Sequence, residues 1–202
     1  MVSGESPVRG SDAVKGALIE AAADMLAEIG PRALSIRNVA ERAGVNHGQI
    51  HHYFGGKRGL LRAAMALLAD EHWENALARS GDSPIPPPLS LQEDARFWQA
   101  TCRAVIEGDL DLARVSIDEG KSVPRRAFEG IREKNQLAED DLEAKAKFAI
   151  LVVSQLGWVA FEEYLLRLAD VEEGDRAAFR EHAKEHLEGM VTEFFGPFPG
   201  RN

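Results

Sequence analysis

Two short helical segments separated by a glycine-containing turn constrain this chain more than any other feature of its sequence. In the stretch "SIRNVAERAGVNHGQIHHYF", residues 35–54, Ser35 is a good N-cap, and the apolar residues after it recur at helical spacing as far as Gly44. Asn46 is a second candidate cap, with Gln49 three residues later in a capping-box relation. Only three residues would then link the two helices. Two short helices joined in this way predict a helix-turn-helix.

A longer amphipathic helix is predicted before this motif. Apolar residues recur every three or four positions between Val14 and Ile29, and Ser11 is a plausible cap at the start. The pair Gly30-Pro31 should end the helix, because glycine favours the left-handed terminator and proline cannot continue a helix. The N-terminal part of the chain is therefore predicted to hold three helices.

The third helix would turn its hydrogen-bonding side chains outward. At about 100° per residue, Ile50 and Phe54 fall on the same face and are expected to pack against the first two helices. Gly48, Gln49 and His52 then point away from them. A helix that enters the major groove of DNA reads base edges with such side chains and reaches phosphates from its flanks. Gln49 can donate to and accept from a base edge, with adenine as its favoured partner.

The charge distribution supports the same interpretation, although the net charge of -9 does not. Residues 1–62 carry a charge of +2, and residues 63–202 carry -11. Within residues 35–62 there are five Lys or Arg and only one acidic residue, Glu41. A solvated charged face is the common explanation of such a cluster. Here it coincides with the predicted helix-turn-helix, as an electrostatic footprint for DNA would.

These residues resemble the N-terminal domain of the TetR family of bacterial transcriptional regulators. The resemblance covers about 50 residues and rests on an ordered set of features at fixed spacing: Gly30 at the end of a long helix, the cap Ser35, Val39-Ala40, Ala43-Gly44-Val45, Tyr53-Phe54, and Lys57 with Leu60. The sequence departs from the family pattern at His51 and His52, where the family commonly has Tyr followed by an aromatic or polar residue.

The resemblance implies an all-α protein with two parts. Residues 1–56 would form the three-helix DNA-binding domain, and residues 57–202 a larger helical domain that binds an effector and dimerises. Such a protein binds a palindromic operator as a homodimer and, as a repressor, is released by a small molecule. Carried over by position, the resemblance and the helical wheel together place DNA contacts at Ser35, Arg37, His47, Gly48, Gln49, His51, His52, Tyr53 and Lys57.

The rest of the chain is predicted to be helical as well. A long helix should begin at Lys57 and end before the proline-rich stretch "SGDSPIPPPLS". Further helices are expected over residues 91–107 and 110–117, and another that opens at Pro124. The last two, over residues 142–168 and 175–195, are expected to form the dimer interface that the resemblance implies, although a monomer could bury both in its own core.

Large or soft side chains on these helices are candidates for an effector pocket. Trp98, Cys102, Trp158 and Phe161 would suit a hydrophobic or amphipathic effector, although each could equally be ordinary core. No catalytic residues, metal ligands or cofactors are expected. The histidines of the H-x-x-E-H pattern at 182–186 lie on a helix whose apolar stripe indicates packing, and no third zinc ligand can be named. The alternative is a small-molecule-binding or hydrolytic all-α protein with a vestigial helix-turn-helix.

A cytoplasmic location is expected. The N-terminus has no apolar block that could serve as a secretory signal, and uninterrupted apolar runs such as residues 148–153 are far shorter than a membrane span of roughly 20 residues. The single cysteine, Cys102, excludes an internal disulfide framework and suits a reducing compartment.

Overall fold

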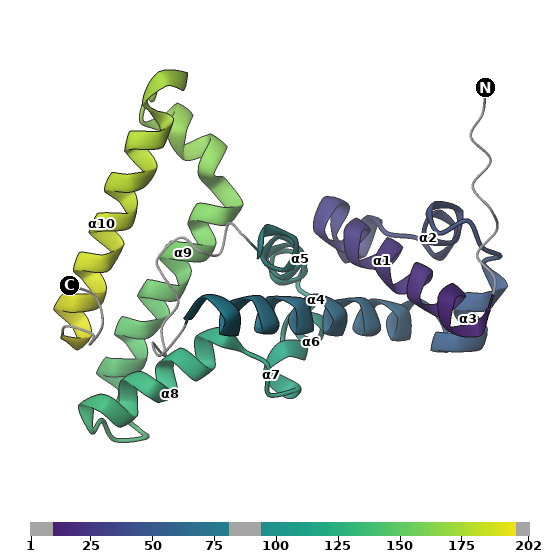
Figure 1. The fold of residues 1–202 in the computed structure, drawn as a ribbon, viewed down its shortest axis with the longest axis horizontal. Coiled ribbons are helices and arrows are strands. Elements are labelled where there is room, and N and C mark those ends of the chain that lie inside the picture. The colour runs from purple at the N-terminus through teal and green to yellow at the C-terminus, as the bar shows by residue number, and fades with distance from the viewer. Residues whose placement is uncertain (1–9, 81–93, 197–202) are drawn as a thin grey trace. The chain divides into compact units, whose positions relative to one another are not determined.

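The computed structural model describes residues 10–80 and 94–196 of the chain, and every regular element within these two ranges is a helix (Figure 1). The all-α prediction is therefore confirmed. The elements are α1 Ser11–Ala33, α2 Ile36–Arg42, α3 Gly48–Phe54, α4 Lys57–Ser80, α5 Ala95–Ile106, α6 Leu110–Ala113, α7 Val115–Asp118, α8 Val123–Asn135, α9 Leu142–Leu168, the 3-10 turn η2 Glu173–Asp175, and α10 Arg176–Phe195.

Several helix ends differ from the predicted ones. Ser11 is the first helical residue of α1 instead of its cap, a position that Gly10 takes. The predicted helix over residues 110–117 is divided into α6 and α7, because the backbone at Arg114 leaves the helical conformation. The helix predicted over residues 91–107 appears as α5, and most of the proline-rich stretch before it lies outside the described residues.

The chain divides into two compact units. Unit 1 comprises residues 1–71 and 99–121, and unit 2 comprises residues 72–98 and 122–202. The α4 and α5 helices each contribute to both units, so the chain passes between them in the middle of these helices. This division groups residues by contact and does not test the predicted domain boundary after residue 56, which stays a prediction.

The core of unit 1 contains the inner faces of α1, α2, α3 and α4. Residues from all four helices are almost fully buried, among them Leu18, Leu26, Val39, Ile50 and Leu60. Alanines on α1 allow the neighbouring helices to approach closely, since Ala22 and Ala23 have no exposed surface. This packing fixes which side of the short α3 faces solvent.

Unit 2 is built around the C-terminal helices. At one end of the unit, α8, α9 and α10 share a small apolar cluster of Ile131, Ala144, Leu151 and Phe195, with Phe128 stacked on Phe148 at a centroid distance of 4.5 Å. Further along, Trp158 of α9 stacks on Phe179 of α10. The two helices form a pair joined by η2 (Figure 1).

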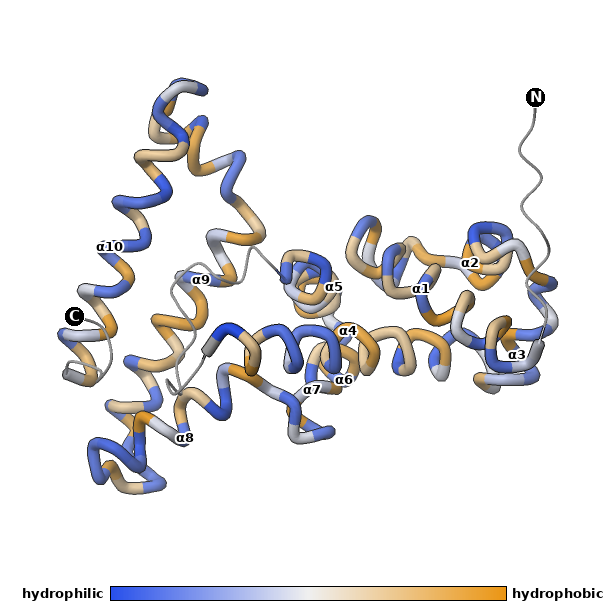
Figure 2. The backbone as a smooth tube through the Cα atoms, in the orientation of Figure 1, coloured by the Kyte–Doolittle hydropathy of each residue, from blue (hydrophilic) through white to orange (hydrophobic). Residues whose placement is uncertain are grey.

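Much of α9 remains exposed in the single chain. Hydrophobic residues recur along its length (Figure 2), and Val153, Phe161 and Tyr164 are each more than half exposed. By length and composition α9 could cross a membrane: its most apolar window has a mean hydropathy of 1.4, and only 17% of that window is buried. The helix itself was predicted over these residues, but its length and composition as a candidate span were not, because polar residues such as Ser154 and Gln155 interrupt its apolar runs. Among residues 10–80 and 94–196, no segment covers this surface.

A buried polar cluster in unit 2 joins α4 to the start of α5. Asp94 lies at its centre, and His72 Nδ1 lies 2.8 Å from the Asp94 carboxylate. Asn75 and Arg79 donate to the same carboxylate. The His72 ring stacks on Phe97 at a centroid distance of 4.7 Å, and both His72 and Asp94 are almost completely buried.

Burial lowers the pKa of His72, an effect that the Asp94 carboxylate only partly offsets. Burial alone would raise the pKa of Asp94, but its three hydrogen-bond donors hold it below the ordinary value.

We expect this cluster to make the fold less stable as the pH falls below about 6.5. Because the pKa of His72 is lower in the folded chain, the unfolded chain binds its proton first, and the free energy of unfolding decreases with falling pH. The contribution has a maximal slope of about 1.4 kcal/mol per pH unit. Urea unfolding at pH 7.5, 6.5 and 5.5 should give a shallower pH dependence for His72→Gln than for the wild type. The exposed His186→Gln should follow the wild type, and equal slopes for all three proteins would contradict the prediction.

Candidate nucleic-acid interface

The turn between α2 and α3 positions the candidate DNA-binding residues. Ser35 is the N-cap of α2, and its Oγ accepts a hydrogen bond of 3.2 Å from the Asn38 backbone N–H, as predicted. Asn46 also caps the next helix, since its Oδ1 accepts from the Gly48 N–H at 2.8 Å, but the N-cap position itself belongs to His47. The connection therefore runs from residue 43 to residue 47 and is longer than predicted. Gly44, with φ of 66°, supplies the left-handed turn.

The α3 helix buries one face and exposes the other. Ile50 is completely buried and Phe54 is partly buried, which confirms the predicted inner face. The candidate residues on or beside α3 are exposed or half-buried: His47, Gly48, His51 and His52 are exposed, and Gln49 and Tyr53 are half-buried. The rings of His52 and Tyr53 contact each other edge to face at 4.8 Å.

The remaining candidates lie at the N-terminal ends of α2 and α4. Arg37, in the first turn of α2, is exposed and has no hydrogen bond or ion pair within the described residues. Lys57 begins α4 directly after the turn that follows α3. Ser35 is half-buried, and because its Oγ accepts from Asn38, its hydroxyl proton can still be donated to another group.

Two arginines of the basic cluster have intramolecular partners. Arg42 forms a two-point hydrogen bond with Glu28 at 2.6 and 2.7 Å, which lowers the pKa of Glu28. Arg58 pairs with Asp109, 51 residues away in sequence, and the hydrogen bond from the guanidinium lowers the pKa of Asp109. Both arginines belong to the positive cluster that the sequence predicted over residues 35–62. Because each is paired with a carboxylate, less positive charge is available in this cluster for contacts with DNA.

Two glycines that sequence reasoning did not single out fix the turn between α3 and α4. Gly56 has φ of 124°, a region that favours glycine. Gly59 packs so closely that a Cβ atom on it would lie 1.9 Å from the Phe54 carbonyl oxygen. No periodicity or motif indicates this contact, because it depends on the angle between two helices.

An apolar cavity of about 60 Å³ lies in unit 2, between α5, α8, α9 and α10. Of the four predicted effector-binding residues, Trp98 lines it, and its indole Nε1 is buried with no hydrogen-bond partner among the described residues. The lining of this cavity does not include Cys102, Trp158 or Phe161, and the Phe161 side chain is 51% exposed. Residues that the sequence did not indicate complete most of the wall: Val123, Pro124, Ala127, Ile131, Phe148, Leu151, Val152, Gln155 and Val191.

The described residues contain no group of three or more His, Cys, Asp or Glu side chains that could hold a metal ion. In the H-x-x-E-H pattern, the exposed His182 contacts the Glu185 carboxylate at 3.2 Å on α10.

Comparisons with known proteins agree with this geometry. Residues 18–64 match the family of bacterial regulatory proteins named after TetR. An HTH-type transcriptional repressor of Mycobacterium tuberculosis is 28% identical over 168 residues, which cover 81% of each chain. The HTH-type transcriptional regulator BetI 1 of Chromohalobacter salexigens is 34% identical over 101 residues, 49% of this chain and 44% of that protein.

The fold is also similar to solved structures. A TetR-family transcriptional regulator from Streptomyces coelicolor has a TM-score of 0.61 at 17% identity, covering 92% of this chain and 83% of its own. A putative TetR-family regulator from Rhodococcus sp. has a TM-score of 0.62 at 19% identity, covering 90% of this chain and 98% of its own. The helix-turn-helix and its family match lead to one conclusion: residues 18–64 of this chain belong to the TetR family of bacterial regulatory proteins.

Proposed function

We propose that this protein is a repressor that binds a palindromic operator as a homodimer and is released by a small hydrophobic effector. The observation that carries the proposal is the outward face of α3, which presents Gly48, Gln49 and His52 opposite the buried Ile50. A helix of this kind can enter the major groove, where Gly48 permits close approach and Gln49 can pair with adenine. The similar protein of Mycobacterium tuberculosis is named a repressor, which favours repression over activation here.

The residues around α3 are suited to phosphate contacts. Arg37 is exposed in the first turn of α2, Tyr53 lies near the end of α3, and Lys57 begins α4. Ser35 and the exposed His47 and His51 add further hydrogen-bond donors. Phosphate contacts position a protein on DNA without reading sequence, so these residues are expected to contribute affinity and the residues of the outer α3 face to contribute specificity.

The cavity beside Trp98 is the proposed effector site. Its lining residues are apolar apart from Gln155, and one of them, Trp98, has a buried indole N–H with no partner among the described residues, so an uncharged, mainly hydrophobic molecule with a hydrogen-bond acceptor suits it. A volume of about 60 Å³ is far below the 300 Å³ or more of typical ligand pockets. Effector binding would therefore have to enlarge the cavity, and this enlargement is the proposed source of the conformational change. Cys102, Trp158 and Phe161 stay candidates for the enlarged site.

The DNA-binding proposal is tested with DNA from the region upstream of the protein's own gene. Gln49→Ala should reduce discrimination between specific and unrelated DNA by about 1–3 kcal/mol, since a base contact is lost. Arg37→Ala should weaken binding to both DNAs and reduce the slope of log affinity against log salt by about one. Fluorescence anisotropy titrations at several salt concentrations measure both effects, with His186→Gln as the control.

The proposal would be contradicted if the wild type bound only weakly, and with the same affinity to the upstream DNA and to genomic fragments of unrelated sequence. The alternative of a vestigial helix-turn-helix on a small-molecule-binding or hydrolytic protein would then be favoured. Saturable and selective binding would instead provide the assay in which candidate effectors are screened for release of the DNA.

A further inference from the structure

The α1 helix is interrupted at Gly30, just before the helix-turn-helix. Gly30 has φ of 79° and ψ of 171°, so the helix ends there and a separate turn, residues 31–33, follows. Such a break leaves carbonyl groups before it and N–H groups after it without helical partners. Leu34 is buried and Ser35 is the N-cap of α2, so the turn at 31–33 determines where α2 begins.

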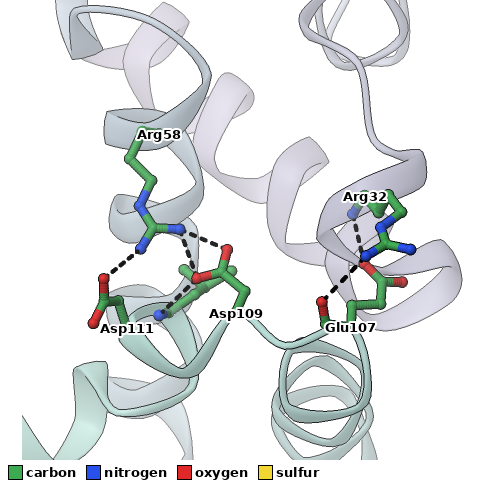
Figure 3. A network of polar contacts seen from close by, with 6 residues as sticks. Arg32, Arg58, Glu107, Asp109 and Asp111 are labelled. Atoms are coloured by element: carbon green, nitrogen blue, oxygen red, sulfur yellow. Dashed lines mark hydrogen bonds and ion pairs between the residues drawn. The ribbon is translucent and has the colours of Figure 1, made fainter.

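The end of α5 supplies hydrogen-bond partners on both sides of this break. Arg103 Nε donates to the Ala27 carbonyl oxygen at 2.9 Å. The Arg32 backbone N–H donates to Glu107 Oε2 at 2.6 Å, as Figure 3 shows. Arg103 and Glu107 lie four residues apart, close to one helical turn. Glu107 therefore acts as an N-cap for the turn at 31–33, although it is 75 residues away in the sequence.

The contact requires glycine at position 30 for a second reason besides its φ angle. A Cβ atom on Gly30 would lie 2.3 Å from Glu107 Oε1 and 3.3 Å from the Arg103 Cβ atom. The backbone of α1 at Gly30 is thus in direct contact with side chains from the end of α5. A shift of α5 would therefore also displace the α1 backbone at the break.

The same segment also attaches to the far side of the helix-turn-helix. Arg58, in the first turn of α4, donates to Asp109 at 2.7 Å and lies 3.5 Å from Asp111 (Figure 3). Asp109 in turn caps α6 by accepting from the Leu112 N–H. Residues 103–111, which we call the bracket, therefore contact the chain directly before α2 and directly after α3.

We propose that Glu107 is a positioning residue for DNA binding, which holds the turn at 31–33 and thereby sets the placement of α2 and α3 on the operator. The inference rests on the proposed function. The contact between the Arg32 N–H and Glu107 is an exposed hydrogen bond, whose loss should lower overall stability only modestly, so the main effect of Glu107 is expected in DNA binding. Because the bracket continues from α5, whose first turn includes the cavity residue Trp98, a displacement of α5 would alter both attachments together.

Three variants of the full-length protein test this role. Glu107→Ala removes the cap, and Glu107→Gln keeps a side-chain oxygen that can accept from the Arg32 N–H. As the control, Asp118→Ala breaks a local ion pair between Arg114 and Asp118, outside the bracket. Glu107→Ala should weaken binding to the selected DNA about three- to thirtyfold, because the free energy that a helix cap contributes no longer holds the turn in the arrangement that binds DNA. The other two variants should stay within about twofold of the wild type, and the salt slope of all variants should be unchanged because the phosphate contacts remain.

Nuclear magnetic resonance gives a readout that does not depend on DNA. In Glu107→Ala the Arg32 amide proton should exchange faster with solvent, and amide chemical shifts should change in α2 and α3. Glu107→Gln should restore both towards the wild type.

Unchanged DNA affinity of Glu107→Ala, alongside normal binding by the wild type, would overturn the proposal. An equal loss in Glu107→Ala and Asp118→Ala would also overturn it, because the effect would then be general destabilisation. If the wild type itself binds no DNA selectively, the proposed function fails instead. In that case the amide chemical shifts still test the role of Glu107 without DNA: if Glu107→Ala leaves the shifts in α2 and α3 unchanged, Glu107 does not position these helices.

Discussion

Gly59→Ala is expected to destabilise unit 1 by about 3 kcal/mol, the upper end of the usual cost of an overpacked site. The added Cβ atom would lie 1.9 Å from the Phe54 carbonyl oxygen and 3.0 Å from its carbonyl carbon. Both are backbone atoms at the end of α3, so no side-chain rotation can relieve the clash. The neighbouring Leu60 and Ile50 are completely buried, which leaves little room for α4 to move away.

The same substitution should also weaken DNA binding, because α3 can only relieve the clash by shifting relative to α4. We expect a loss of affinity of at least about tenfold, equivalent to about 1.4 kcal/mol. Urea unfolding followed by circular dichroism measures the change in stability, and anisotropy titration at a temperature where the variant remains folded measures the affinity.

Gly16→Ala is the matched control for this experiment. Gly16 lies on the exposed side of α1, and a Cβ atom there would have no neighbour within 4 Å. In an exposed helix interior this change should be neutral or stabilise the protein by up to about 1 kcal/mol. Equal unfolding free energies for Gly59→Ala and Gly16→Ala would show that the close approach of α4 to Phe54 does not exist in solution.

Helices could be predicted from this sequence much better than the contacts between them. The bounds of α9 agree with the prediction at both ends, and α10 and α4 differ by a single residue, because apolar spacing is a local signal. Ile50 was correctly placed on the inner face of α3 for the same reason. The break at Gly30 was also indicated, since Gly30-Pro31 is a strong local stop signal.

Contacts between distant residues had no such signal. Glu107 contacts a backbone amide 75 positions away, and an isolated glutamate at a helix end has the appearance of an ordinary surface residue. Arg58 was counted as part of the DNA-facing charge, because a sequence cannot show that Asp109 neutralises it. Among the proposed effector residues, Trp98 lies at the cavity, whereas the helix position of Phe161 leaves its side chain half exposed.

The exposed surface of α9 is expected to be the dimer interface. Ile150, Val153, Gly157, Phe161 and Tyr164 follow one another at intervals of three or four residues and so share one face of the helix. The four large side chains among them are each about half exposed or more, and Gly157 leaves open space where a Cβ atom would be. A partner helix could approach closely along this face, and a second copy of the chain would bury the same stripe by two-fold symmetry.

Val153→Glu and Phe161→Glu should therefore each convert the dimer into a monomer, because a carboxylate would be buried without a partner. Operator affinity should fall roughly hundredfold or more, since the two half-sites would no longer be bound by one linked particle. The exposed apolar residue Ile117, in α7 of unit 1, provides the control Ile117→Glu. Sedimentation equilibrium should give twice the chain mass of 22.1 kDa for the wild type and the control, and 22.1 kDa for the two α9 variants.

A wild-type monomer at micromolar concentration, or dimers that persist in both α9 variants, would contradict this interface.

The same variants also distinguish two explanations of why α9 is both apolar and exposed, namely dimerisation and insertion into a membrane. If the stripe covers a second copy, the charged variants should remain soluble monomers with unchanged helix content. If it inserts into a lipid bilayer, the wild type should bind to neutral phosphatidylcholine vesicles in a flotation assay and the charged variants should not. We expect dimerisation, because a regulator that reads two operator half-sites needs a second recognition helix held at a fixed distance.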